Sequence, residues 1–388
     1  MTELASWRAD TPGCAQVAHF NNAGAALMPG PVIRAVNEHL QLEAERGGYE
    51  AARRHHDRLE AVYDSVARLL GCARHQVALL ENATRAWDTV FYSLPLRAGD
   101  RILTSVSEYA SNYIAFLQRA RHTGACIEVV PNDRHGQLDL AALAEMLDER
   151  VVLVAVNHVP TNSGLVQPAA AIGALLADHP ALYLLDACQS VGQMPTQVDD
   201  LGCDFLSATS RKYLRGPRGV GFLYVRRPAA LEPAVLDLHA AQWTAPQSYT
   251  IREDARRFET WEGFVAGRLG LGAAVDYALE VGLKRAWARL SRLAEQLRSK
   301  LSQIEGITLT DYGERLGGIV TFTCGLAADD LRDRLERENI NVSTCSNFSA
   351  RLDMEGKGLE RVVRASVHYY NSEDEIDRLA QTLSLLRA

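Results

Sequence analysis

The sequence predicts an α/β protein, with a mostly parallel sheet covered by helices and a smaller α+β region after it. Short apolar runs alternate with helical stretches from about residue 60 to residue 225. Strands separated by helices need crossover connections, which place them in a parallel sheet with both faces covered. The last third differs, because residues 268–305 form one long helical pattern. This change predicts a large domain at 18–265, then an interdomain helix and small domain at 266–388, with residues 1–17 packed on the small domain.

Seven short runs predict the strands of the large sheet. Each is rich in Val, Ile, Leu or aromatic residues and is bounded by polar or turn-forming residues. The runs are residues 77–82, 101–106, 126–131, 151–159, 182–187, 203–209 and 221–225. Helical patterns lie between several of them, at 59–71, 84–94, 111–124 and 140–149.

The C-terminal third predicts alternating helices and strands of a smaller unit. One or two helices over 268–305 come first. The segments that follow are a strand at 317–325, a helix at 328–339, strands at 340–344 and 362–370, and a closing helix.

Composition excludes several classes of protein. The net charge of −7 and pI near 5.9 argue against nucleic acid or an anionic membrane as the main partner. The seven cysteines form no CxxC pair, which argues against a disulfide framework or a metal site. The first residues lack the apolar stretch of a signal peptide, and the apolar runs are too short to span a bilayer. We therefore expect a cytoplasmic protein that binds neither membrane nor nucleic acid.

Polar residues follow the predicted strands where their carboxyl ends should meet, which is where ligands bind in such sheets. The stretch "DFLSATSRKYLRGPRGVGFLYVRR" (204–227) places one lysine among five arginines between two buried runs. Its Ser, Thr, Arg and Gly residues are suited to an anion cradle. A helix that begins near Thr84 adds backbone N–H groups, which also bind anions. Other strand ends contribute Tyr109, Asn162, Asp186 and Gln189.

These residue types suit an aromatic aldehyde that carries a phosphate. An amine such as that of Lys212 forms a Schiff base with an aldehyde, and burial with Arg211, Arg215 and Arg218 nearby should lower its pKa. A buried carboxylate at Asp186 keeps a pyridine nitrogen protonated, so that the ring accepts electrons. Singly, each residue has a simpler explanation, such as a cap or core packing.

The chain from about residue 18 resembles the class V aminotransferase group of pyridoxal-phosphate enzymes, which includes cysteine desulfurases, isopenicillin N epimerase-like proteins and C–S lyases. The stretches that carry the resemblance are "HFNNAGAALMPGPV", "ENATRAW", "SEYASNY", "HVPTNSGLVQP", "LLDACQSVG", the lysine stretch above, "RRFETWEG" and "VRASVHYYNSEDEIDRL". The resemblance implies fold type I with a seven-stranded sheet, pyridoxal 5′-phosphate as cofactor, and a homodimer with shared active sites.

The resemblance also implies roles for single residues. Lys212 would carry the cofactor, with Asp186 at the pyridine nitrogen, Tyr109 on the ring face and Gln189 at the phenolic oxygen. Further cofactor contacts are implied at Ala83, Thr84, Asn162, Thr209, Arg211, Trp261 and Glu262, the last two reaching the partner subunit's site. Arg364 and Asn22 would bind the substrate, with Arg364 on its carboxylate.

Departures from the desulfurase pattern lead to the functional prediction. Tyr109 and Arg211 stand where desulfurases often carry histidine, and Phe348 stands where they carry the nucleophilic cysteine. Cys345 lies close by and suits a small buried filler. We therefore expect a lyase that eliminates the β-substituent of a cysteine conjugate or sulfoxide, and we disfavour a desulfurase. An aminotransferase, a decarboxylating variant or an epimerase stays open, and a catalytically idle cofactor-binding protein is the remaining alternative.

Overall fold

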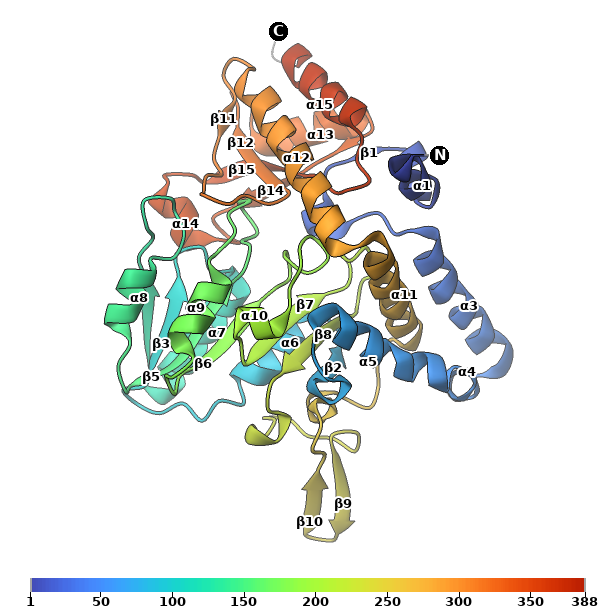
Figure 1. The fold of residues 1–388 in the computed structure, drawn as a ribbon, viewed down its shortest axis with the longest axis vertical. Helices are drawn as coiled ribbons and strands as arrows, with labels where there is room; N and C mark the ends of the chain where they lie inside the picture. Colours follow the sequence, from blue (N-terminus) through green and yellow to red (C-terminus); the bar gives the residue numbers. More distant parts are fainter. Residues whose placement is uncertain (1, 387–388) are drawn as a thin grey trace.

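The structure is a computed structural model that describes residues 2–386. Within that range a seven-stranded sheet forms the centre of the molecule (Figure 1). Its spatial order is β2 (Val77–Leu80), β8 (Gly221–Val225), β7 (Phe205–Thr209), β6 (Leu182–Asp186), β5 (Val151–Asn157), β3 (Arg101–Ser105) and β4 (Cys126–Val130). Strand β8 runs antiparallel to β2 and β7, and the remaining pairs are parallel. The expected α/β fold with a mostly parallel sheet is confirmed.

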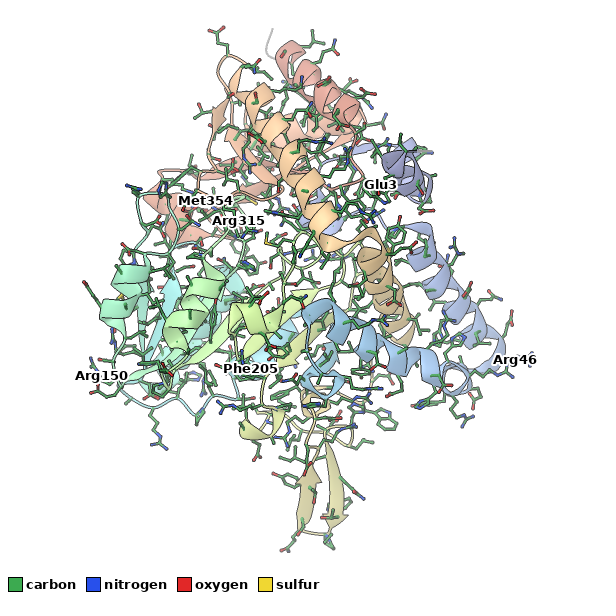
Figure 2. All side chains as sticks on the ribbon, viewed as in Figure 1. Glu3, Arg46, Arg150, Phe205, Arg315 and Met354 are labelled. Carbon is green, nitrogen blue, oxygen red and sulfur yellow. The ribbon has the colours of Figure 1, made fainter. Side chains whose placement is uncertain are left out.

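Alternation along β5 shows how the sheet is covered on both faces. Leu153 and Ala155 pack with the helices α6 (Ala83–Phe91) and α7 (Ala110–Thr123). Val154 and Val156 point to the opposite face, where the covering helices are α5 (His56–Leu70), α9 (Ala169–Leu176), α10 (Val198–Leu201) and α11 (Val265–Val281). A strand buried on both faces is apolar at nearly every position, which explains why these runs were recognisable in the sequence. Figure 2 shows the side chains that fill the interior, among them Phe205 on β7.

A second, four-stranded antiparallel sheet lies near the C-terminus. Its order is β11 (Thr308–Leu309), β12 (Ile319–Thr323), β15 (Arg361–Ser366) and β14 (Ser343–Ser346). The helices α12 (Leu283–Ser302), α13 (Ala328–Arg337) and α15 (Glu373–Leu385) supply core residues that pack with this sheet. Strand β1 (Ala18–His19) pairs in parallel with β13 (Ile340–Asn341), so the N-terminal segment crosses to this part of the molecule.

The long helical pattern in the sequence is two helices, α11 and α12. They meet at Gly282, whose φ of 85° is in the region that favours glycine. Helix α11 packs against α3 (Gly30–Arg46) and α5, whereas α12 packs against β12, β11 and α15. The domain division at residue 266 stays a prediction.

The first residues pack against the C-terminal segment. Helix α1 (Glu3–Ala9) carries Trp7, whose ring centroid lies 5.1 Å from that of Tyr369. Arg8 forms an ion pair with Glu375 at 2.8 Å.

A hairpin of β9 (Ala241–Ala245) and β10 (Ser248–Ile251), which the sequence did not predict, projects from the body (Figure 1). The remaining elements are α2 (Asn22–Ala25), α4 (Gly48–Arg54), α8 (Leu140–Met146), α14 (Arg351–Gly356) and the short 3₁₀ turns Pro12–Ala15, Arg74–Gln76, Pro228–Ala230 and Ala255–Phe258. None of the helices within residues 2–386 combines the length and apolar character needed to cross a bilayer. The same residues contain no group of three or more His, Cys, Asp or Glu side chains arranged to hold a metal ion.

Candidate active site

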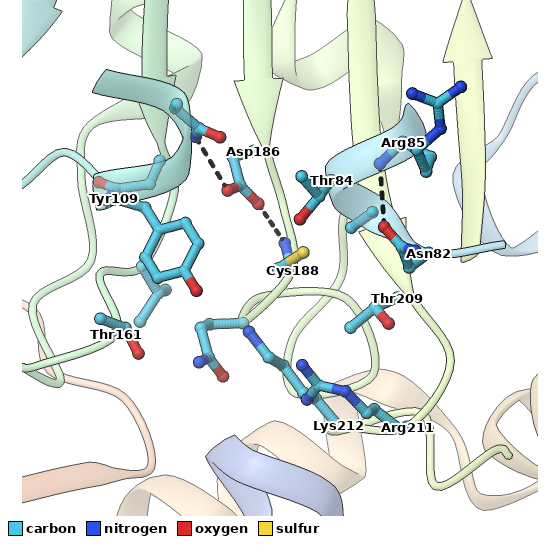
Figure 3. A pocket seen from close by; sticks show the side chains of 15 residues that line it. Asn82, Thr84, Arg85, Tyr109, Thr161, Asp186, Cys188, Thr209, Arg211 and Lys212 are labelled. Atoms are coloured by element: carbon cyan, nitrogen blue, oxygen red, sulfur yellow. Dashed lines mark hydrogen bonds between the residues drawn. The ribbon is translucent and has the colours of Figure 1, made fainter. Parts of the chain in front are cut away.

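A cavity of ≈ 380 Å³ opens at the carboxyl ends of the large-sheet strands (Figure 3). This size lies within the range of small-molecule sites. The cavity is lined by Asn82, Ala83, Thr84, Arg85, Tyr109, Asn112, Asn157, Val159, Thr161, Asp186, Cys188, Gln189, Thr209, Arg211 and Lys212. Eight of the thirteen site residues predicted from the sequence are therefore brought together here: Ala83, Thr84, Tyr109, Asp186, Gln189, Thr209, Arg211 and Lys212.

One wall of the cavity is the N-terminus of α6. Asn82 caps the helix, and its side-chain oxygen accepts a hydrogen bond of 2.9 Å from the backbone N–H of Arg85. Gly221 lets β8 approach the helix start, because a Cβ there would lie 2.9 Å from the nitrogen of Ala83. The N–H groups of the first turn and the helix dipole make this wall suitable for a phosphate.

Asp186 ends β6 with its carboxylate held on two sides. One oxygen accepts from the backbone N–H of Cys188 at 2.9 Å, and the other accepts from the side-chain amide of Asn112 at 3.2 Å (Figure 3). The residue is 8% exposed. A carboxylate fixed in this way can accept a charge-assisted bond from a protonated ring nitrogen.

Lys212 follows β7 in a turn that the backbone N–H of Arg215 closes on the Lys212 carbonyl at 2.9 Å. Burial lowers the pKa of the lysine, and the charges of Arg211 and Arg364 add to this effect. The pKa of Lys212 is therefore lowered, as expected. Two of the three arginines that were expected to lower it need correction. Arg215 turns away to hydrogen bond with Leu27, Tyr369 and Thr11, and Arg218 is exposed.

Arg364 approaches the cavity from β15 behind Thr161. One terminal nitrogen donates to the Thr161 carbonyl and hydroxyl at 3.0 Å each, and the other donates to Asn21 at 3.3 Å. Its Nε is buried and has no hydrogen-bond partner within residues 2–386. A guanidinium with remaining donors beside the cavity can bind a carboxylate.

Asn22 and Asn162, both predicted as site residues, are occupied elsewhere in the protein. The Asn22 amide is fully buried and donates to the carbonyls of His19 and Ser366 at 3.0 and 2.6 Å. The Asn162 amide donates to Asp353 at 2.7 Å. Neither lines the cavity, and Asn21 rather than Asn22 contacts Arg364.

Trp261 and Glu262 lie on a loop outside the cavity of their own subunit. The Trp261 side chain is 52% exposed, and its backbone N–H donates to Asp237 at 2.7 Å. Their predicted contact with the partner subunit's cofactor stays a prediction.

Two cysteines are near the cavity. Cys188 lines it, and burial followed by the charge of Asp186 raises the pKa of its thiol well above the usual range. Cys345 is buried behind Thr161 and donates its S–H to the Thr161 carbonyl at 3.4 Å. Phe348 lies on the loop after β14 and is 81% exposed.

Sequence reasoning did not single out Asn112, Asn157 or Cys188. Asn112 and Cys188 lie close in sequence to the predicted Tyr109 and Asp186, so the geometry of a helix turn and a strand end would have indicated them. Asn157 is the last residue of β5, and the pairing of β5 with β6 places it beside Asp186.

The residues present fit pyridoxal phosphate on chemical grounds. The cavity combines an anion-binding helix start, a partly buried amine with lowered pKa and a fixed carboxylate. In addition, the side-chain oxygen of Gln189 is buried without a hydrogen-bond partner within residues 2–386, which leaves a polar contact for a ligand.

Comparison with known proteins identifies the family. The model of the family described as "Aminotransferase class-V" matches residues 18–379. The chain belongs to this family. It is a pyridoxal-phosphate-dependent enzyme, and its cofactor supplies an aldehyde and a protonated ring that withdraws electrons from the substrate Cα.

Several relatives along nearly the whole chain are named as cysteine desulfurases. A protein of Methanothermobacter thermautotrophicus named "Probable cysteine desulfurase" is 30% identical over 97% of this chain and 96% of its own length. One of Synechocystis sp. with the same name is 30% identical over 94% of this chain and 90% of its own length. The apo structure of the cysteine desulfurase from Thermococcus onnurineus NA1 superposes with a TM-score of 0.92 at 27% identity, covering 100% of this chain and 98% of that one.

These relatives contradict the functional prediction, which preferred an eliminating lyase and disfavoured a desulfurase. The prediction was wrong because it was based on departures from the desulfurase pattern at single positions, namely Tyr109, Arg211 and Phe348. Similarity along nearly the whole chain carries more weight than these positions.

Proposed function

We propose that the protein removes sulfur from L-cysteine and leaves L-alanine. The observation that carries this proposal is the 30% identity, over 97% of the chain, to a protein named as a probable cysteine desulfurase. The cavity beside Arg364 and Lys212 supports it, because an amino acid offers a carboxylate and a Cα proton to these two groups. The expected substrate is thus a small free amino acid.

Each side chain has a distinct task in this proposal. Arg364 binds the α-carboxylate through its free donors and orients the Cα proton. Lys212, with its lowered pKa, removes that proton and returns protons later. Asp186 keeps the ring nitrogen protonated, while Tyr109 covers one face of the cavity.

We propose that the sulfur passes to a thiol from outside the chain, either a small thiol or a cysteine of another protein. A thiol attacks as the thiolate, and burial keeps the Cys188 thiol protonated. Cys345 points its S–H at the Thr161 carbonyl rather than into the cavity. When the acceptor is a dithiol, its two thiol groups supply the two electrons that are needed. Cysteine and the dithiol then give alanine, hydrogen sulfide and one disulfide.

The decisive test is a product analysis of the cofactor-loaded enzyme with L-cysteine and excess dithiothreitol. We expect alanine and sulfide in equal amounts, and none from Lys212→Ala. Pyruvate with ammonia, or transfer of the amino group to an added keto acid, would contradict the proposal.

Separate variants test the sulfur acceptor. Cys345→Ala and Cys188→Ala should each retain most of the alanine formation with dithiothreitol. Loss of activity in Cys345→Ala, together with a persulfide on Cys345 in the parent enzyme, would show that the acceptor lies within the chain.

We also propose a homodimer with shared active sites. Exposed aromatic side chains on the loop that follows Glu259 and on the β9–β10 hairpin support it, since Trp261 is 52% and Trp243 78% exposed. Sedimentation should give twice the chain mass, and Trp261→Ala should weaken cofactor binding. A monomer that is fully active at low concentration would rule the proposal out.

A further inference from the structure

A second buried carboxylate lies behind Asp186. Glu108 is 3% exposed, and its Oε1 accepts a hydrogen bond of 2.9 Å from the side-chain amide of Asn112. The same Asn112 nitrogen donates to Asp186 at 3.2 Å. One amide therefore bridges two acidic side chains.

The bridge uses the full donor capacity of Asn112, because an amide nitrogen carries two hydrogens. Glu108 is held in turn by the backbone N–H of Tyr109 at 2.7 Å and the hydroxyl of Thr104 at 2.9 Å. Asp186 keeps its second contact with the backbone N–H of Cys188. Glu108 thus fixes Asn112, and Asn112 fixes one oxygen of Asp186.

We propose that Glu108 is a positioning residue for the cofactor. Through Asn112 it holds Asp186 in place for the ring nitrogen, and its own charge adds to the negative potential there. The inference rests on the cofactor of this family and is independent of where the substrate sulfur goes.

Glu108 is also set to change its charge near neutral pH. Burial and the charge of Asp186 raise its pKa to about 7, while its hydrogen bonds from Tyr109, Asn112 and Thr104 lower it. Asp186, from the end of β6, is the charged group that faces it, and the contacts from β3 and α7 are the neutral Thr104 and Asn112. Below this pKa the acid is neutral, and above it a second negative charge lies behind the ring nitrogen.

Absorbance of the bound cofactor, titrated with pH, tests the proposal without any turnover. In the parent enzyme we expect a transition with its midpoint near neutral pH, separate from the one that belongs to Lys212. Glu108→Gln keeps the size and the acceptor oxygen but loses the charge, so this transition should disappear. The matched control Glu145→Gln, on an exposed position of α8, should leave it unchanged.

A second variant tests the proposal in case Glu108→Gln does not fold. Thr104→Val removes one hydrogen bond to the Glu108 carboxylate, which should move the same midpoint upward by several tenths of a pH unit or more. Asn112→Leu, which breaks the bridge, should weaken cofactor binding several-fold, as measured by titration of the cofactor-free protein. An unchanged titration in both Glu108→Gln and Thr104→Val would overturn the assignment, as would unchanged cofactor affinity in Asn112→Leu.

Discussion

At the scale of single residues, Lys212 differs from the other lysines of the chain in its surroundings. The sequence contains four lysines, at 212, 284, 300 and 357. Lys300 and Lys357 form ion pairs with Asp377 and Asp353 at 2.8 Å, and Lys284 is exposed. A lysine whose pKa is lowered by burial has a larger share of free amine, which is the form that adds to an aldehyde.

We expect borohydride to attach the cofactor irreversibly to Lys212 in the loaded enzyme. Peptide mass spectrometry should find the adduct on the peptide that contains this residue, and the three other lysines serve as internal controls. Lys212→Ala should bind the cofactor without a covalent link. An adduct on any other lysine would remove Lys212 from its assigned role.

Arg364 is expected to affect substrate binding more than cofactor binding. Arg364→Ala would remove the proposed bidentate contact with the substrate carboxylate, which should lower kcat/KM about 100-fold, mainly through KM. Arg364→Lys should recover part of the loss, because it keeps the charge but not the planar fork. The control is Arg361→Ala on the same strand, an exposed residue paired with Asp329, and its kinetics should stay near those of the parent. Equal losses in both variants would indicate a general effect on β15.

At the scale of elements, helix α6 is a structural unit whose N-terminus lines the cavity and is suited to binding an anion. Asn82→Ala should destabilise the protein by about 1 kcal/mol in chemical denaturation, since the cap on Arg85 is lost. Asn82→Asp keeps an N-cap oxygen and should retain stability. Its added negative charge lies at the cavity wall, however, and should weaken binding of the phosphate-bearing cofactor several-fold. If the two variants affected cofactor binding alike, charge at this helix start would not be the cause.

Elements with strong periodicity were predictable, and those that depend on contacts were not. The large-sheet strands are apolar because they are buried on both faces. The end of α5 at Gly71 was predictable because glycine accommodates the left-handed conformation common after a helix, and its φ is 69°. The hairpin β9–β10 was missed because most of its residues are exposed and carry no buried stripe. The sequence does not decide whether the helix breaks between α11 and α12 at Gly282, since a single glycine is tolerated within helices.

The site was predictable where residues follow strand ends directly, as with Asp186 and Lys212. Two neighbouring asparagines are not distinguished by the sequence: Asn22 is the predicted substrate contact, whereas Asn21 is the one that lies within hydrogen-bond distance of Arg364. Glu108 was missed because its position behind Asp186 arises from the packing of α7 against the sheet. The functional prediction was wrong since the sequence alone does not show how much departures at single positions, such as Tyr109, Arg211 and Phe348, should count.

At the scale of the whole molecule, Arg215 connects the loop of Lys212 to one segment near the start of the chain and another in its C-terminal part. This arginine is 1% exposed and adopts a positive φ of 62°. Its guanidinium donates to the Leu27 carbonyl at 2.9 Å, to the Tyr369 hydroxyl at 2.8 Å and to the Thr11 hydroxyl at 2.5 Å. It also lies 4.3 Å from the ring centroid of Tyr370. The segment around α1, the lysine loop and the C-terminal segment thus meet at one buried cation.

We expect Arg215→Gly to loosen this junction while keeping the backbone of the loop. Because glycine accommodates the positive φ, any loss of stability is due to the missing guanidinium and the space that it filled. The free energy of unfolding should decrease by at least about 2 kcal/mol in chemical denaturation. Asn339→Gly is the matched control, because Asn339 has a similar φ of 54° and should change stability by less than about 1 kcal/mol. Hydrogen exchange in Arg215→Gly should increase in residues 2–27 before it increases in the strands of the large sheet. Equal protection of residues 2–27 in the parent and in Arg215→Gly would show that the N-terminal segment is held by its other contacts, such as that of Trp7 with Tyr369.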